Sequence, residues 1–291
     1  MTPAARGSCL VAAAAVCWGA QPTLTKLLFV QRLGPVELSA LRAVIALALL
    51  AGLLAAAAPK RLLVARTDLP LLALFGVAGM ALVNWAYFVN IRHNTVATAV
   101  LLAQTAPVIV APLSAVLFRE RIGRRVRAAC ALSVLGALVM VSGGGAGPLA
   151  LNVTGLAAGL FCALAYAVYT LLGKRVLVRH DASTVLVYAL LFATLFWGVV
   201  APRAYRDVPD LTRDAWAGLL ALSTVSTLVP FALSLRGMSL LAPTRAAIML
   251  TLEPVAAIVI AWLALGEPLG PFEAAGGALV VGAALLVQRQ A

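Results

Sequence analysis

The sequence predicts an all-α integral membrane protein, with ten transmembrane helices arranged as two inverted five-helix repeats around a central cavity. Three observations support this fold class. The 291 residues are 63% hydrophobic and 11% charged, with a mean hydropathy of +1.04, which excludes an ordinary soluble domain. The chain contains ten apolar windows of membrane-spanning length, and its second half repeats a pattern of its first half.

The apolar windows set the number of spans. A helix needs roughly 20 apolar residues to cross about 30 Å of hydrocarbon. Windows of that length, bounded by charged residues, Pro or Gly, lie at about 8–28, 35–58, 69–91, 95–118, 123–143, 152–173, 182–201, 213–235, 243–266 and 270–288. The connections are short, the longest being 202–212, so we expect any chemistry to lie within the membrane or at its surfaces.

The internal repeat is clearest around two prolines, Pro107 and Pro254, which lie 147 residues apart. Each is followed thirteen residues later by Glu and sixteen residues later by Gly: Glu120 and Gly123, then Glu267 and Gly270. Composition alone does not produce such a match, which indicates duplication. Because five spans is an odd number, the second copy must cross the membrane in the opposite sense. We expect repeats at 1–147 and 148–291, an arrangement typical of secondary transporters.

The formal charge of +12 reflects topology rather than nucleic-acid binding, because the basic residues lie between the spans. With the N-terminus inside, 14 of the 22 Lys and Arg residues fall on the cytoplasmic side and six on the other. The positive-inside rule therefore predicts cytoplasmic N- and C-termini. The basic run at 119–127 is expected to be an orientation signal, with an anionic-lipid or partner site as the alternative.

The four cysteines lie in apolar segments without metal-ligand or redox spacing, so we expect core fillers, no metal site and no cofactor. The N-terminal segment has one feature of a signal peptide, because Arg6 precedes an apolar run. That run continues to Leu28, and cleavage would remove part of the repeat, so we interpret it as the first span.

Spans one and two each carry polar residues. In span one, Trp18 and Gln21 precede the helix-breaking Pro22, and they either line a polar cavity or mark a kink near the outer interface. In span two, Arg42 lies about two turns in from the outer end. A buried Arg is costly in lipid, so it either snorkels beside Glu37 or pairs with the acid of span nine.

Span three carries a polar stripe, because Asn84, Tyr87 and Asn90 recur at three-residue spacing on one side of a helix. Phe88 lies next to this stripe. Asn inside a span often joins helices rather than binding a substrate. We expect Asn84, Tyr87 and Phe88 to line the cavity, with helix–helix contact as the alternative.

Span four combines Thr98 and Gln104 with Pro107 near the midplane, where the helix cannot remain straight and fully hydrogen-bonded. Span five is rich in Gly and Ala and is expected to serve packing. In span six, Tyr166 aligns with Trp18 to within one residue under the offset of 147. Tyr166 either shares a cavity role with Trp18 or belongs to the core.

Span seven has only Tyr188 and Trp197 of note. Span eight contains Ser223 and Thr227, which share one helix face with Pro230. These hydroxyls either line a pore or bond to carbonyl groups of their own helix.

Span nine holds Glu253, the one acid of ten that lies near the middle of a span, immediately before Pro254. Met249 lies on the same helix face, one turn earlier. Such a carboxyl group is protonated, paired with a cation or in contact with water, and an intramembrane acid predicts a functional site. We expect it to hold a substrate ammonium or a proton, with a structural helix lock as the alternative.

Several segments together resemble the drug/metabolite transporter superfamily, in its bacterial EamA-like branch, over nearly the whole chain. They are Trp18-Gly19, Leu41-Arg42, TAVLLAQTAPV at 98–108, LFRE at 117–120 and LEPVAAIVIAWLALGE at 252–267, followed by Gly270. The resemblance implies a cavity lined mainly by spans one, three, four, six, eight and nine, and efflux of small metabolites, commonly amino acids. The first copy has Ala106 where the second has Glu253, so the halves are not chemically equivalent.

We therefore expect an inner-membrane secondary transporter that exports neutral or aromatic amino acids by alternating access, with Pro22, Pro107, Pro230 and Pro254 as hinges. Its expected partners are the small-molecule substrate, the bilayer and candidate coupling protons, in a monomer or homodimer without nucleic acid. Alternative solutes are drug-like cations, nucleosides and nucleotide-linked sugars. A channel is a further alternative, and an intramembrane enzyme would need paired acid–base groups at one depth, which the sequence lacks.

Overall fold

The computed structural model describes residues 2–30, 33–93, 99, 102–103, 105–143, 153–205, 211–265 and 270–288, and no strand occurs in these ranges. Five stretches are long and apolar enough to cross a membrane: Pro35–Ala57, Arg66–His93, Val153–Val176, Ala182–Val200 and Arg213–Ser239. The all-helical membrane fold is therefore confirmed. The ten spans and their inverted repetition stay predictions.

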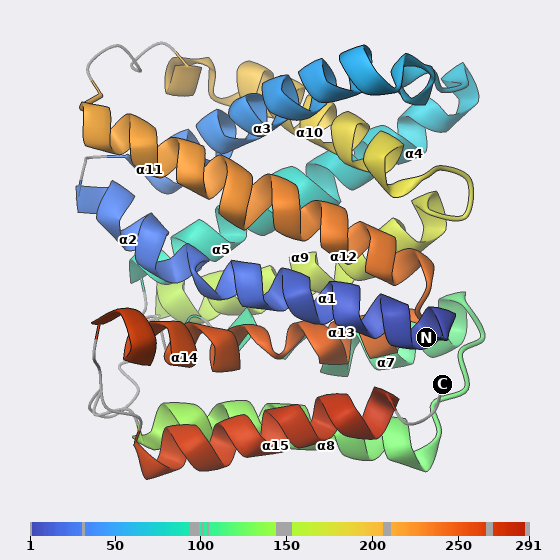
Figure 1. Cartoon of the computed structure of the whole chain (residues 1–291), viewed down its shortest axis with the longest axis vertical. Helices are drawn as coiled ribbons and strands as arrows, with labels where there is room; N and C mark the ends of the chain where they lie inside the picture. Colours follow the sequence, from blue (N-terminus) through green and yellow to red (C-terminus); the bar gives the residue numbers. More distant parts are fainter. Residues whose placement is uncertain are drawn as a thin grey trace.

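The helices run side by side across the molecule, and α1 begins at the end where α15 stops (Figure 1). In the first half they are α1 (Pro3–Gly19), α2 (Gln21–Val30), α3 (Pro35–Ala57), α4 (Leu69–Gly76), α5 (Leu82–His93), α7 (Ala106–Leu117) and α8 (Arg124–Gly143). In the second half they are α9 (Val153–Val176), α10 (Ala182–Val200), α11 (Arg213–Ser223), α12 (Val229–Ser239), α13 (Pro243–Leu250), α14 (Glu253–Leu265) and α15 (Pro271–Gln288). Short 3₁₀ segments are η1 (Pro59–Leu62), η2 (Arg66–Asp68) and η4 (Pro202–Tyr205).

Proline lies in the first turn of many of the helices, and the four predicted hinge prolines are among them. Helices α2, α7, α12 and α14 each carry proline as their second residue: Pro22, Pro107, Pro230 and Pro254. Proline fits the first turn of a helix, because the N–H it lacks would have no partner there. Spans one and nine are consequently divided in two, with a turn at Ala20 and another at Thr251 and Leu252.

Spans three and eight each contain a wider, π-helical turn, η3 (Val77–Ala81) and η5 (Thr224–Leu228). The two turns lie 147 residues apart, and so do the starts of α3 and α10, of α7 and α14, and of α8 and α15. Hydrogen bonding in a π turn spans five residues, which shifts the alignment of the carbonyl groups that follow. Side chains bond to some of them, as when Thr227 Oγ1 donates to Leu222 O at 2.8 Å.

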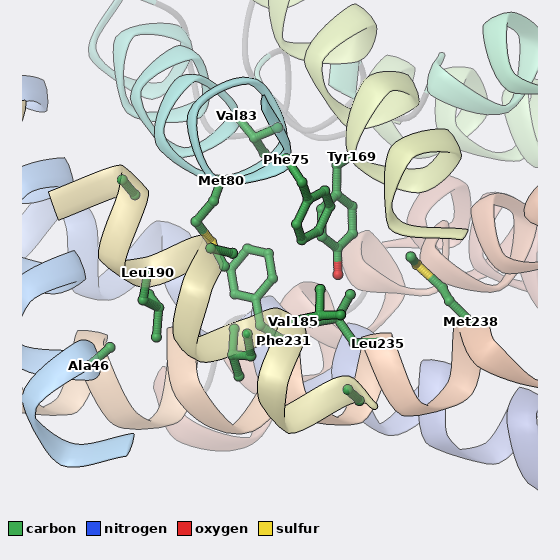
Figure 2. Close-up of a cluster of buried hydrophobic side chains, with 14 of the residues drawn as sticks. Ala46, Phe75, Met80, Val83, Tyr169, Val185, Leu190, Phe231, Leu235 and Met238 are labelled. Carbon is green, nitrogen blue, oxygen red and sulfur yellow. The ribbon is translucent and has the colours of Figure 1, made fainter. Parts of the chain in front are cut away.

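The central core is aromatic. Tyr169 of α9 stacks on Phe75 of α4, with ring centroids 5.7 Å apart, and meets Phe231 of α12 edge-on at 5.4 Å. Figure 2 shows these rings together with Met80 and Leu235, so that helices from both halves of the chain meet in one cluster. The Tyr169 hydroxyl lies 3.1 Å from Ser234 Oγ, which satisfies its polar end.

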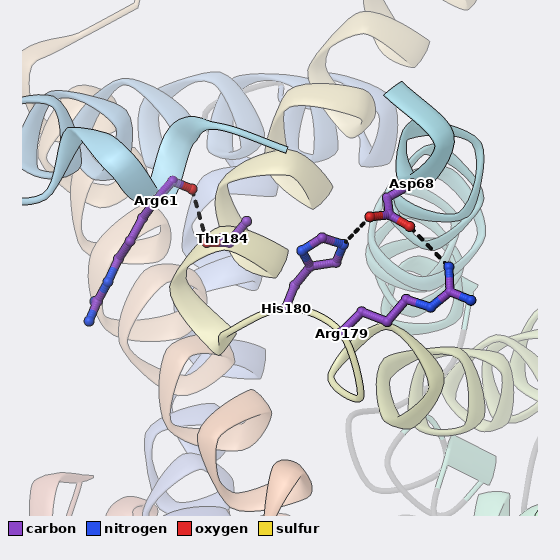
Figure 3. A network of polar contacts seen from close by, with 5 residues as sticks. All are labelled: Arg61, Asp68, Arg179, His180 and Thr184. Atoms are coloured by element: carbon purple, nitrogen blue, oxygen red, sulfur yellow. Dashed lines mark hydrogen bonds and ion pairs between the residues drawn. The ribbon is translucent and has the colours of Figure 1, made fainter. Parts of the chain in front are cut away.

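Polar contacts join the two halves at one end of the bundle. Asp68, immediately before α4, lies 3.0 Å from Arg179 Nη1 and 3.1 Å from His180 Nε2, both in the connection before α10 (Figure 3). Thr184 Oγ1 also donates to Arg61 O at 2.9 Å. At one edge of the molecule, α8 and α15 pack against each other (Figure 1).

Candidate functional site

Glu253 is the centre of the candidate site. It begins α14, directly after the turn that divides span nine, and is 3% exposed. Tyr87 of α5 donates a hydrogen bond from its hydroxyl to Glu253 Oε1 at 2.9 Å. The start of a helix also favours a negative charge. The structure therefore brings together two residues that the sequence placed in the site from spans three and nine.

Tyr87, which bonds to this acid, belongs to a group of aromatic rings. The Tyr87 ring meets Tyr166 of α9 edge-on, with centroids 6.5 Å apart. Tyr87, Phe88 and Cys162 belong to one buried cluster, against which Tyr166 packs. Spans three and six thus bring the rings of Tyr87, Phe88 and Tyr166 together, and their role in a substrate cavity stays a prediction.

Trp18 lies where α1 ends, close to α14. A Cβ placed on its neighbour Gly19 would lie 2.8 Å from the backbone N of Ala257, about one turn after Glu253. This close approach holds the end of span one against span nine. Trp18 Nε1 donates to Ser226 O at 3.2 Å, and its ring meets Phe231 edge-on at 5.0 Å.

Arg42 is the residue that the sequence-based site left out. Its side chain is 1% exposed, Nη2 donates to Ser226 O at 3.2 Å, and the guanidinium carbon lies 5.2 Å from the centre of the Phe88 ring. Within the described ranges, both ion pairs involve Asp68, so Arg42 pairs neither with Glu37 nor with Glu253. Arg42 thus neither snorkels beside Glu37 nor pairs with Glu253. It contacts a backbone carbonyl and the face of an aromatic ring instead.

The remaining predicted site residues either bond within their own span, are buried, or lie outside the described residues. Asn84 donates from Nδ2 to Met80 O at 2.7 Å, and Thr227 bonds to Leu222 O, so both supply hydrogen bonds within their own spans. Gln21, Ser223 and Met249 are buried, and so are the four prolines. Thr98 and Gln104 lie outside the described residues.

Two further observations delimit the site. A groove of about 480 Å³ between α7 and α8, lined by residues such as Val108, Ile122 and Arg127, contains none of the predicted site residues. In the described ranges, no group of three or more His, Cys, Asp or Glu side chains could hold a metal ion. The charged and polar groups of the candidate site described above are Glu253, Tyr87 and Arg42.

Comparisons with known proteins show which family the chain belongs to. The profile of the EamA-like transporter family matches residues 5–142 and 153–289. A probable terminal-alkyne amino-acid exporter of Streptantibioticus cattleyicolor is 31% identical over 250 residues, 84% of this chain and 80% of that protein. The threonine/homoserine exporter RhtA of Escherichia coli strain K12 is 30% identical over 247 residues, 80% of this chain and 77% of that protein.

One solved crystal structure of a protein superimposes with a TM-score of 0.79 over 98% of this chain and 97% of its own, at 20% identity, which shows a shared fold. The relatives are transporters and exporters rather than enzymes. The family profile covers both halves of the chain and nearly its whole length. This multi-pass membrane protein is therefore a transporter that belongs to the EamA-like transporter family.

Proposed function

We propose that this transporter exports small zwitterionic metabolites, in particular neutral or aromatic amino acids, across the bacterial inner membrane by alternating access. The observation that carries the proposal is the buried Glu253, which is bonded to Tyr87, whose ring in turn meets that of Tyr166 from another helix. A buried acid of this kind suits an ammonium group, and aromatic faces favour a nearby cation. The amino-acid exporters among the relatives support the substrate class.

The proposed architecture is two inverted repeats at 1–147 and 148–291, with both termini in the cytoplasm. Support comes from the π turns and helix starts that recur at the same spacing of 147 residues. The excess of Lys and Arg on one side supports the orientation. An inverted repeat places the substrate site between the halves near the midplane, which is where the sequence places Glu253 in its span.

The proposed gates are the proline-containing helices of spans four and nine. Glu120, after α7, accepts hydrogen bonds through Oε2 from Ser114 Oγ and from Thr244 Oγ1, the latter at 2.9 Å. Thr244 is the second residue of α13, and its N–H lies 3.4 Å from the same oxygen. We call this contact the Glu120 latch. It joins span four to span nine at the end that the charge distribution assigns to the cytoplasm.

Counterflow in proteoliposomes tests the function. Vesicles are loaded with one unlabelled amino acid at a time, and entry of labelled phenylalanine, threonine or leucine is followed. Saturable acceleration that weakens on Trp18→Ala and Glu253→Gln is the expected result. A folded protein that accelerates none of these exchanges would contradict the proposed substrate class and direct attention to drug-like cations, nucleosides and nucleotide-linked sugars.

Proton coupling is the second part of the proposal. Glu253 can release and take up a proton, and the titratable groups nearest to it are Tyr87, Tyr166 and Cys162. If Glu253 carries the coupled proton, a pH gradient drives uptake in the wild type and not in Glu253→Gln. An equal response of both proteins to the gradient would leave facilitated exchange as the mechanism.

A further inference from the structure

Unsatisfied polar atoms gather on one side of the site. Within the described residues, Arg42 Nε and Nη1 have no hydrogen-bond partner, and neither do the hydroxyls of Ser223 and Ser226. All three residues are at most 1% exposed. Buried polar groups in native proteins are almost always bonded, and an exception indicates a missing water, ion or ligand. A guanidinium group has five N–H donors, and the structure shows a partner for one of them.

These atoms are held in place by neighbouring helices. Both π turn η5 and helix α11 contact α3, which carries Arg42. Arg42 and Trp18 donate to the same carbonyl oxygen, that of Ser226, which fixes the guanidinium group beside the indole. The face of Phe88 covers the guanidinium group from α5. The guanidinium group of Arg42 is therefore held in place, and its Nε and Nη1 groups remain available to donate hydrogen bonds.

The cation and the acid contact successive residues of α5. Phe88 contacts Arg42, and the preceding residue, Tyr87, is bonded to Glu253. The two charged side chains form no ion pair with each other, since the described pairs all involve Asp68. A ligand with a single charge would leave one of these buried groups uncompensated, which is costly. A zwitterion can satisfy both.

We propose that Arg42 binds the carboxylate of the substrate, assisted by the hydroxyls of Ser223 and Ser226, while Glu253 and Tyr87 bind its ammonium group. This inference rests on the proposed export of zwitterions and specifies how they are recognised. A carboxylate fits a guanidinium edge with two parallel N–H···O bonds. The carrier then selects amino acids over amines and over carboxylic acids, because each of these lacks one charge.

The test separates the two charges of the ligand. Purified full-length protein is titrated with phenylalanine, phenylalaninamide, phenethylamine and 3-phenylpropionate, and Kd is measured by calorimetry for the wild type, Arg42→Gln and Glu253→Gln. Arg92→Gln and Asp214→Asn, at exposed positions, are the matched controls. Arg42→Gln should weaken phenylalanine and 3-phenylpropionate at least about tenfold, and change the two ligands without a carboxylate less than about twofold. Glu253→Gln should weaken phenylalanine and phenethylamine and leave 3-phenylpropionate unchanged.

A structural role for Arg42 gives a different pattern, in which all four ligands weaken together and the thermal midpoint falls. That pattern, or unchanged binding of phenylalanine to Arg42→Gln, overturns the inference and leaves amino-acid export standing. Binding of 3-phenylpropionate that depends on Arg42, without binding of phenylalanine, overturns the proposed function and retains the carboxylate site. If none of the four ligands binds, both the carboxylate site and the proposed export of zwitterions are overturned.

Two measurements keep the inference testable if Arg42→Gln does not fold. The wild type alone must bind phenylalanine at least about tenfold more tightly than phenylalaninamide, since the amide lacks the carboxylate. Arg42→Lys keeps the charge and loses the planar fork, so it should bind phenylalanine with intermediate affinity. Equal wild-type affinities for the acid and the amide contradict the role of Arg42.

Discussion

At the scale of single residues, the site consists of a few polar groups in an apolar interior. Tyr87 and Glu253 come from different halves of the chain, and their hydrogen bond joins span three to span nine. Arg42 and Trp18 meet at one carbonyl oxygen of span eight. Because nonpolar side chains surround these contacts, each polar atom that loses its partner pays the full cost of desolvation.

The first prediction concerns the hydroxyl of Tyr87. Tyr87→Phe keeps the ring and removes the donor to Glu253, and a hydrogen bond to a charged group contributes about 1.5–3 kcal/mol. We expect the half-saturating concentration of amino acid in counterflow to rise roughly tenfold or more. Tyr188→Phe is the control, because Tyr188 donates to Leu62 O at 2.7 Å, on α10 and away from the site. Similar losses in both variants would contradict the assignment.

The second prediction concerns the contact between spans one and nine at Gly19. In Gly19→Ala, the new methyl group would lie 2.8 Å from Ala257 N and 2.9 Å from Ala256 Cβ, and backbone atoms cannot move aside as a flexible side chain can. We expect a lower thermal midpoint in detergent and slower exchange. Gly52→Ala is the control, because a Cβ there meets nothing within 4 Å. An unchanged thermal midpoint and exchange rate in Gly19→Ala would contradict this prediction and show that α1 and α14 separate easily.

At the scale of helices, the sequence predicted the places where spans break better than the contacts between them. Proline has a local effect on its own helix, so Pro22, Pro107 and Pro254 could be assigned to helix starts from the sequence. The π turns could not be predicted, because the hydropathy pattern is the same whether backbone hydrogen bonds join residues five apart, as in a π turn, or four apart, as in an α-helix. The partners of Arg42 depend on the packing of three spans, which no local pattern encodes.

The same limit applies to side chains within one span. The stripe of Asn84, Tyr87 and Asn90 predicted a shared face, yet Asn84 bonds to Met80 O in its own span while Tyr87 reaches Glu253. Residue spacing gives the direction of a side chain and leaves its partner open. Charged residues within spans were the sequence feature that best predicted the candidate site, since both Glu253 and Arg42 stand out in the sequence as isolated charges inside apolar segments.

The third prediction concerns the Glu120 latch, which joins α7 and α13. Glu120→Gln and Thr244→Val each weaken it, and we expect a larger share of molecules with the cytoplasmic end open. Cys162, buried beside Tyr87 and Phe88, serves as a natural probe, because opening lets a thiol reagent reach it. Modification of Cys162, followed by peptide mapping, should be several times faster in both variants.

Thr224→Val is the control for the latch, since the exposed Thr224 hydroxyl bonds to Leu220 O of its own span. The double variant of Glu120 and Thr244 should be no faster than either single variant, because both remove the same contact. Additive effects of the two substitutions would show that they act separately and that the latch is not one unit.

At the scale of the whole molecule, contacts at one end hold the two halves together. Asp68 precedes span three in the first half, and its partners Arg179 and His180 precede α10 in the second (Figure 3). The Glu120 latch lies between halves in the same way. Alternating access requires such contacts to break at one end while others form at the opposite end. Which end is cytoplasmic therefore decides the state that this structure represents.

The last prediction fixes that orientation. Val178, in the connection before α10, and Pro202, just after α10, are exposed at opposite ends of one helix. Both are uncharged, so replacing either by Cys leaves the charge bias of the connections intact. In cells carrying Cys9→Ser, an impermeant thiol reagent should label Pro202→Cys in intact spheroplasts and Val178→Cys only after permeabilisation. The excess of Lys and Arg, summed over all connections of the chain, assigns the connection before α10 to the cytoplasm.

The outcome bears directly on the transport cycle. With the expected labelling, the Glu120 latch closes the cytoplasmic end, and the cycle proceeds from here by release of substrate to the outside. With reversed labelling, the latch closes the outer end, and weakening it would expose Cys162 to reagent from outside. One comparison tests the latch and the orientation together. The side from which reagent reaches Cys162 in Glu120→Gln must be opposite to the side on which Pro202→Cys is labelled.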